Sequence, residues 1–411
     1  MTPAAWASMS SAALLALAWP AAAQDTAEQR AGVEAGPERD EVGGPFQFSV
    51  MYTGDLWRNA RGGRRRGGAY LDNLDVALEV DAERAFGWRG ATILVSGLHN
   101  NDRRLSETLV GDLQVASNID TYGATRLYEA WVQQQVAGGS LKAGVVDLNS
   151  EFDVNETRAL FINSSHGVGP ELSQVGQTGP SIFPITGLAV RVLGRPAPDW
   201  TVRLAAFDGA PGDPRRPRRT RLHLDGREGA LLIGEIAHGR ADGLRIALGG
   251  WRHTGEMKDF ERRAPGGAVA TRGGSGGGYA VVETAPQPVG DRALRLFARA
   301  GAAEGRSHPV DRSLSAGAVL SGRLIGFEEE ALGFAVSAAR LGRAYRRAAG
   351  LVGDTPARQE INIELTYRFR PTPWLVLQPD VQYVIDPGAD RTLRNALAFG
   401  LRFELSAGFS R

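Results

Sequence analysis

Hydrophobic and polar residues alternate one by one over several stretches of this chain, which is the pattern of a β-strand with one apolar and one polar face. The clearest stretch is 397–405, where Leu or Phe occupies every odd position and Ala, Gly, Arg or Glu every even one. The same alternation occupies residues 361–370, 375–385 and 74–81. We therefore predict an all-β protein.

The spacing of these stretches indicates what kind of β protein this is. Alternation, with turns marked by Gly, Pro and Asp, gives about sixteen segments of roughly ten to fifteen residues, the length that a tilted strand needs to cross a bilayer. We predict that the strands begin near Phe46, Tyr70, Trp88, Ala124, Gly139, Thr186, Trp200, Gly229, Gly243, Gly277, Arg292, Arg312, Ala331, Gln359, Trp374 and Asn395.

The predicted connections alternate between short and long. A transmembrane up-and-down antiparallel β-barrel has short turns at its periplasmic end and long loops at its outer end, whereas a soluble sandwich has no reason to produce this rhythm. We therefore predict such a barrel, with about sixteen strands. Short connections are expected at 86–87, 138–139, 195–198, 240–242 and 370–373, and long ones at 61–68, 101–123, 149–185, 209–228, 255–276 and 344–358.

Composition and the N-terminal sequence agree with export to a membrane. The mean hydropathy of -0.21 is compatible with a barrel, because lipid-facing and lumen-facing residues alternate along each strand. The apolar run Ala12–Trp19, followed by Pro20 and three alanines, resembles a secretory signal peptide, although no Lys or Arg precedes Arg30. We predict a signal peptide over 1–23, a flexible leader over 24–45 and the barrel over 46–411.

Several segments carry a resemblance to one family. They read LYEAWVQQ, FDGAPGDP, TPWLVLQPDVQYVIDPG and NALAFGLRFEL, together with the long segment that begins DLNSEFDVNETRALF at Asp147. From Tyr128 onward the chain resembles the carbohydrate-selective porins of the OprB type. The resemblance implies a sixteen-stranded outer-membrane barrel through which sugars diffuse passively, with the third extracellular loop folded into the lumen. Residues 149–185 occupy the place of that constriction loop.

A sugar channel needs planar hydrogen-bonding groups and aromatic faces that bind weakly enough to allow release. Within the strand at 124–136, we expect Tyr128, Ala130, Val132 and Val136 to face lipid. The candidate pore-lining residues are Glu129, Trp131, Gln133 and Gln135 on that strand's other face, Asn149, Glu151, Asp153, Glu156, Asn163 and His166 on the loop, and Arg295, Arg299, Arg368 and Asp380 on later strands.

Structural roles remain open for each of these candidates. Asp and Asn in the loop also suit turn capping, Trp131 also suits a spacer in the lumen, and inward Arg and Glu also form ladders that stiffen a barrel wall. Opposed charges on the loop and the wall are expected to create a transverse field. A general or anion-biased diffusion porin is the alternative function, and an outer-membrane enzyme comes third.

Other chemistries find little support. Adjacent Ser165 and His166 lack the geometry of a hydrolase, and the Gly-rich run 273–278 has no following Lys, so we interpret it as a flexible loop. With six His and no Cys, we expect no metal site and no cofactor. The basic runs 61–66 and 215–221 suit lipopolysaccharide better than nucleic acid. The expected partners are sugars, outer-membrane lipid and lipopolysaccharide, and the barrel assembly machinery; monomer and trimer both remain open.

Overall fold

The computed structural model describes residues 44–213, 218–220, 222, 228–240, 243–264, 268–351 and 353–410. The predicted signal peptide and nearly all of the predicted leader lie outside the described residues, as does most of the basic run 215–221. No helix in the described part of the chain is both long and apolar enough to cross a membrane.

Sixteen long antiparallel strands form one closed sheet in the described part of the chain, because β1 pairs with both β2 and β17. A short extra strand, β11 (Gln287–Val289), pairs with β12 in the turn that precedes it. The long strands are β1 (Phe46–Gly63), β2 (Gly67–Asp81), β3 (Ala91–Asn100), β4 (Ala124–Val136), β5 (Gly139–Val146), β6 (Gly187–Gly194), β7 (Trp200–Asp208), β8 (Ala230–His238), β9 (Arg245–Arg263), β10 (Val269–Glu283), β12 (Arg292–Ala303), β13 (Val310–Ser321), β14 (Glu328–Leu341), β15 (Gln359–Thr372), β16 (Leu375–Ile385) and β17 (Arg394–Ser410).

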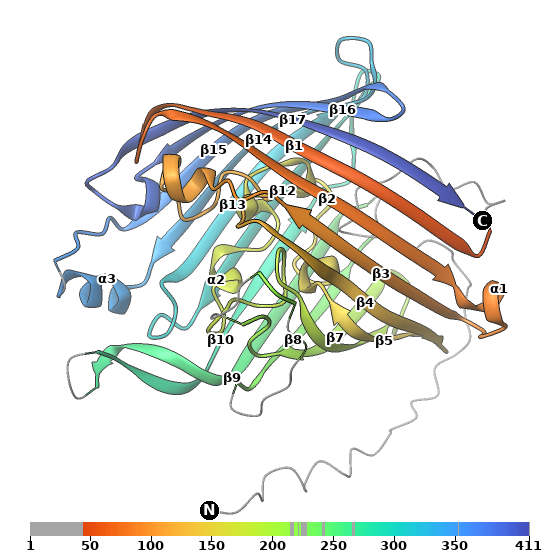
Figure 1. Ribbon diagram of the computed structural model, residues 1–411, viewed down its shortest axis with the longest axis horizontal. Coiled ribbons are helices and arrows are strands. Elements are labelled where there is room, and N and C mark those ends of the chain that lie inside the picture. The colour runs from red at the N-terminus through yellow and green to blue at the C-terminus, as the bar shows by residue number, and fades with distance from the viewer. Residues whose placement is uncertain are drawn as a thin grey trace, which may run out of the picture.

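The two ends of the barrel differ as the predicted rhythm requires. Figure 1 shows α1 (Ala82–Phe86) and the C-terminus at one end, and α3 (Arg343–Gly350) with the outer part of the β9–β10 hairpin at the other. Short turns such as 137–138 and 373–374 lie at the α1 end, which is therefore the periplasmic end. The exposed indole rings of Trp88, Trp200 and Trp374 also lie at this end and form part of an interfacial aromatic belt.

The two faces of the wall confirm the alternation predicted from the sequence. Along β15 and β17, Leu365, Phe399 and Leu401 are exposed on the outer face, whereas Glu364 and Arg402 are buried on the inner one. An apolar exterior around a polar interior is the arrangement of a barrel that is surrounded by lipid. Closure of the sheet also pairs the backbone groups of neighbouring strands, which lipid could not hydrogen-bond.

The interpretation of 255–276 as a long connection, and of the Gly-rich run 273–278 as a flexible loop, was wrong. Residues 255–263 continue β9, and β10 begins at Val269, well before Gly277, so the glycines lie in a paired strand. Large inward side chains explain their presence in a wall: a Cβ at Gly277 would lie 2.4 Å from the Trp251 ring. The connection predicted at 61–68 is also shorter, because β1 extends to Gly63 and β2 starts at Gly67.

Candidate functional site: the loops inside the barrel

The β5–β6 loop, residues 147–186, lies inside the barrel, where Figure 1 shows its coils and the short helix α2 (Pro170–Ser173) between the walls. Three 3-10 turns shape it: η2 (Leu148–Ser150), η3 (Arg158–Leu160) and η4 (Ser164–His166). The Asp147 side chain accepts from the Asn149 N–H at 2.9 Å, and that of Asn163 accepts from the Ser165 N–H at 3.1 Å. Side-chain capping therefore fixes the turns of the loop. For Asn163 this is the turn-capping role that the sequence left open beside solute contact.

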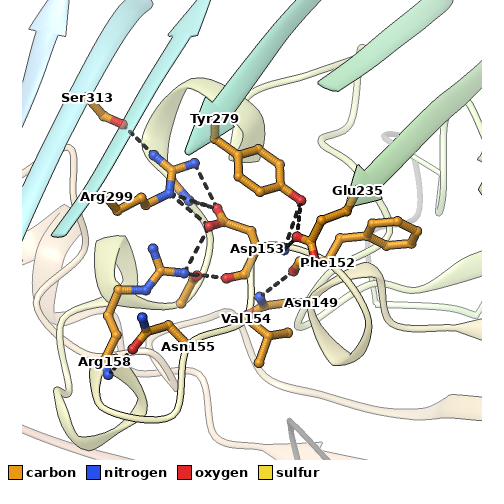
Figure 2. A network of polar contacts seen from close by, with 12 residues as sticks. Asn149, Phe152, Asp153, Val154, Asn155, Arg158, Glu235, Tyr279, Arg299 and Ser313 are labelled. Atoms are coloured by element: carbon orange, nitrogen blue, oxygen red, sulfur yellow. Dashed lines mark hydrogen bonds and ion pairs between the residues drawn. The ribbon is translucent and has the colours of Figure 1, made fainter. Parts of the chain in front are cut away.

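An ion-pair network at the centre of the lumen attaches this loop to the wall (Figure 2). Arg299 on β12 donates to the Asp153 carboxylate from Nε at 2.9 Å and from Nη2 at 2.8 Å, and to Glu171 Oε1 at 2.6 Å. Arg158 of the loop donates to Asp153 Oδ1 at 3.0 Å. All four residues are almost completely buried, so two guanidinium groups and two carboxylates neutralise one another away from water.

The charge balance of this network is visible in the pKa of Asp153. Burial alone would raise that pKa, but the guanidinium groups of Arg299 and then Arg158 outweigh burial and hold it below the ordinary aspartate value. The backbone N–H of Asp153 also donates to Glu235 Oε2 at 3.1 Å and to the Tyr279 hydroxyl at 3.0 Å (Figure 2). Groups from β8, β10 and β12 thus hold Asp153 in place, and the guanidinium groups of Arg299 and Arg158 keep its side chain ionised.

Further anchors are distributed around the lumen wall. Glu151 pairs with Lys142 on β5 and with Arg191 on β6, the latter at 3.0 Å. On the opposite side, the Glu364 carboxylate on β15 accepts from the Ile162 N–H at 2.6 Å and from the Asn163 N–H at 3.2 Å. Contacts from both sides span the lumen, so the loop crosses the channel.

Two wall glycines let the loop approach this closely. A Cβ at Gly301 on β12 would lie 2.0 Å from Glu171 Oε1, and one at Gly333 on β14 would lie 2.7 Å from the Leu160 side chain. Any larger residue would push the loop away from the wall. These positions therefore bear on the width of the channel although neither contributes a polar group.

The β3–β4 loop, residues 101–123, also enters the lumen, which the sequence analysis did not predict. The Gln114 N–H donates to Glu360 on β15 at 2.9 Å, and the Ser117 hydroxyl donates to Asp55 on β1 at 2.7 Å. This loop meets the β5–β6 loop through the Asn118 N–H and the Ile162 carbonyl, 2.9 Å apart. The inward charges of Asp55 and Glu360 could have indicated that a loop enters the lumen here, because a buried carboxylate requires hydrogen-bond donors.

Solvent exposure divides the predicted pore residues into two groups. The buried group contains Glu129, Gln133, Glu151, Asp153, Asn163, His166, Arg299 and Asp380. Glu129, Glu151, Asp153, Asn163 and Arg299 join the β5–β6 loop to the wall, whereas Gln133 and Asp380 bond to neighbouring wall residues. The accessible group retains some contact with water: Trp131, Gln135, Asn149, Glu156, Arg295 and Arg368. Of the accessible group, Arg368 pairs with Glu404 at 3.2 Å, and Gln135 lies at the periplasmic end of β4.

A row of wall arginines lies opposite the loop's exposed edge. Arg203 on β7, Arg245 on β9 and Arg295 on β12 have side chains that are 23%, 20% and 23% exposed. The Arg245 Nη1 donates to the Val154 carbonyl at 2.7 Å, and Arg295 lies 3.7 Å from Glu156, whose side chain is 47% exposed. Arg203 and Arg245 were missed, although the alternation along their strands places both on the inner face.

Trp131 faces the lumen as predicted, and Tyr128 does not face lipid. The Trp131 indole donates to Glu129 at 3.2 Å, and the Lys142 ammonium lies 4.1 Å from the ring centroid. The expected lipid-facing position of Tyr128 was wrong: its hydroxyl donates to Asp147 at 2.7 Å, and its ring packs against Phe183 of the loop. The irregular pairing of β3 with β4 near this residue breaks the strict alternation.

His166 lies in an apolar site instead of the water-filled passage. Its ring packs 4.9 Å from that of Phe161 and 5.9 Å from that of Phe297, and neither ring nitrogen has a hydrogen-bond partner among the residues that the structure describes. Burial, followed by the nearby Arg158, lowers the pKa of His166 to about 3. The ring is therefore neutral, and its 3.8 Å approach to Glu364 is not an ion pair.

Comparison with known proteins shows the family to which this barrel belongs. The family model described as carbohydrate-selective porin, OprB family, matches residues 65–406. Porin B of Pseudomonas aeruginosa is 25% identical in an alignment of 398 positions that covers 87% of each chain. The fold is that of Pseudomonas putida OprB at high pH (TM-score 0.78, 21% identity, 88% of this chain and 94% of that one) and, more distantly, of the outer-membrane channel DcaP of Acinetobacter baumannii (TM-score 0.54, 12% identity, 91% and 100%).

Proposed function

The chain belongs to the carbohydrate-selective porin family of the OprB type, and we propose that sugars pass it along the exposed edge of the β5–β6 loop, beside the row of wall arginines. Members of this family admit carbohydrates across the bacterial outer membrane by passive diffusion, and this chain is an outer-membrane porin of that kind. The proposal concerns which side chains the sugar touches on its way.

The exposure of the wall charges is the observation that supports this route. Arg203, Arg245 and Arg295 are each about one-fifth exposed, whereas the carboxylates behind them, Glu235 and Glu283, are 1% and 4% exposed. On this wall, water, and hence a solute, meets guanidinium N–H groups before it meets the carboxylates of Glu235 and Glu283. Guanidinium groups present several donors in a fixed plane, which suits the acceptor oxygens of sugar hydroxyls.

The loop supplies complementary groups across the passage. The Glu156 carboxylate is the more exposed partner of Arg295, and it offers acceptors for sugar hydroxyl protons. Trp131 offers an aromatic face, although Lys142 covers one side of the ring. Contacts from partly hydrated groups are weak individually, and weak binding at several sites permits both entry and release.

Sugar-induced block of ion current through single channels tests the route. Arg245→Gln should weaken the block by a neutral disaccharide several-fold, because the variant removes charged donors at the passage. Arg368→Gln is the matched control. Arg368 on β15 is also 20% exposed in the lumen, but it pairs with Glu404 on β17, away from the three arginines of β7, β9 and β12. Equal loss of block in both variants, or in neither, would exclude the proposed route.

An anion-biased diffusion pore is the second candidate, favoured by the same exposed arginines. Liposome swelling with a neutral sugar and with an acidic sugar of matched size distinguishes the two. Faster entry of the neutral sugar supports sugar selection, and faster entry of the acidic one supports an anion bias. Reversal potentials in a salt gradient give an independent measure of the same preference.

We propose that the lumen carries out no covalent chemistry. The Ser165 hydroxyl donates to Asn163 at 2.6 Å, not to His166, so the adjacent pair is no nucleophile with its base. Ser275 and His308 do share a hydrogen bond of 2.7 Å, but both residues are fully buried and out of reach of a substrate. Lipid-ester hydrolysis by the purified protein would contradict this part of the proposal.

A further inference from the structure

Two arginines lie side by side on the outer face of the barrel, at its extracellular end. Arg312 on β13 and Arg340 on β14 are register partners. Arg312 is exposed, and its register partner on β12, Ala302, is also exposed on the outer surface. The β14–β15 connection emerges at the same end as the β5–β6 loop, so both arginines lie at the level of the outer leaflet.

These two guanidinium groups have no counter-charge within the described part of the chain. No described carboxylate forms an ion pair with Arg312 or Arg340, and the Nε of Arg340 is buried without a hydrogen-bond partner. Like charges directly opposite each other on neighbouring strands are destabilising. An anion from outside the chain would relieve this repulsion.

The helix that follows β14 adds further positive charge at the same end. α3 carries Arg343, Arg346 and Arg347, and the Nε of Arg346 is also buried with no partner in the described part of the chain. Only Arg347 approaches a carboxylate among the described residues, Glu261 at 3.9 Å, while remaining largely exposed. The extracellular edge of β13, β14 and α3 is therefore a concentrated basic surface, which we call the β13–α3 basic edge.

The surface directly below this edge is apolar. On β13, Leu314 follows Arg312 on the outer face and is exposed; on β14, Phe334 continues the same face toward the periplasm and is also exposed. Small residues separate these large ones, including Ala300 and Ala316. Such a surface suits acyl chains, so one molecule with phosphates above and acyl chains below fits both parts.

We propose that the β13–α3 basic edge binds a phosphorylated lipid of the outer leaflet, the lipid A part of lipopolysaccharide, through Arg312 and Arg340. Guanidinium groups bind phosphate in a bidentate manner, and two adjacent ones match a ligand with more than one charged oxygen. The site lies outside the lumen and is independent of the proposed sugar route. It also differs from the basic runs 61–66 and 215–221 favoured by sequence.

Lipid binding to the full-length protein tests this site. The detergent-purified protein is titrated with diphosphorylated lipid A and with the same lipid after removal of its phosphates, and bound lipid is counted by native mass spectrometry. The double variant Arg312→Gln/Arg340→Gln should bind diphosphorylated lipid A roughly 30-fold more weakly, because each basic group near an anionic lipid surface contributes roughly fivefold. The phosphate-free lipid should bind wild type and variant alike.

Arg58→Gln is the matched control. Arg58 is exposed on the outer face near the extracellular end of β1, but its register neighbours are Gly68 and Phe399, so no second arginine lies directly opposite it on β2 or β17. Its loss should change lipid A binding less than twofold. If the double variant does not assemble, each single variant should still show about a fivefold loss.

Three outcomes would overturn the proposal. The first is equal binding of lipid A by wild type and the double variant, and the second is equal binding by wild type of lipid with and without phosphates. The third is a lipid-free oligomer, seen by light scattering in detergent, that the double variant dissociates; it would assign the β13–α3 basic edge to contact with a second copy of the chain.

Discussion

Replacing Arg299 with Gln removes the cation that holds two buried carboxylates of the β5–β6 loop against β12. Arg299 binds Asp153 and Glu171 through hydrogen bonds whose shortest are 2.8 Å and 2.6 Å, and both carboxylates are fully buried. Removing one partner of a buried ion pair costs about 3–5 kcal/mol, because the remaining charge stays in a low-dielectric environment. The opened form of the loop should therefore become roughly 10²- to 10⁴-fold more populated.

Hydrogen exchange and channel conductance measure this opening directly. The Gly169 N–H donates to Asp153 Oδ2 at 2.9 Å, so its exchange reports whether the loop remains attached. In Arg299→Gln we expect its exchange to accelerate by about two orders of magnitude and the single-channel conductance to rise. The barrel should still assemble, because Arg299 faces inward and the lipid-facing surface is unchanged.

Arg295→Gln is the control on the same strand. Arg295 lies 3.7 Å from Glu156 and 3.8 Å from Glu283 and is 23% exposed, so its loss should cost less than about 1 kcal/mol. If both variants accelerate exchange at Gly169 equally, or if Arg299→Gln leaves it unchanged, burial of the central pair does not hold the loop, and the reasoning above is refuted.

Three further predictions concern the β5–β6 loop and the wall beside it. Deleting residues 150–183 should raise conductance and reduce discrimination among sugars while heat-modifiable barrel still forms; unchanged conductance would place the segment outside the passage. Trp131→Ala should weaken sugar-induced block by about 1 kcal/mol without altering conductance of small ions, and equal block in both channels would remove Trp131 from the route. Burial lowers the pKa of His166 from 6.5 to about 3 in the closed loop. As pH falls below about 6.5, His166 is protonated in the open loop but not in the closed one, so the closed loop loses stability relative to the open loop. His166→Phe should remove that part of any rise in conductance on acidification, and an identical pH profile for wild type and variant would contradict it.

The strands were predictable because their signal is local. Each inward or outward position on β15 and β17 is set by the pleat, and lipid demands an apolar residue on every outward one. The signal fails where the wall departs from this rule. Tyr128 sits at irregular pairing, and the glycines of β10 carry no side chain by which to recognise a face.

The loop contacts were not predictable from local pattern. Glu360 receives the Gln114 N–H from 246 positions away in the sequence, and Arg299 binds Asp153 from 146 positions away. The periodicity of each strand shows that such a charge faces inward but not which loop meets it. This is why the inward path of residues 149–185 came from family resemblance, and why the inward path of 101–123 was missed.

The packing of the β5–β6 loop also decides where selectivity can reside. Phe152 and Leu172 of the loop join Phe207 and Trp251 of the wall in a buried apolar cluster, so the loop has a hydrophobic core as well as its ion pairs. A segment held by both burial and neutralised charge does not open at little cost, unlike a mobile lid. The width of the passage is then set by side chains at the loop's exposed edge. Substitutions of Glu156, Arg245 or Arg295 should therefore change which solutes pass while leaving the loop in place.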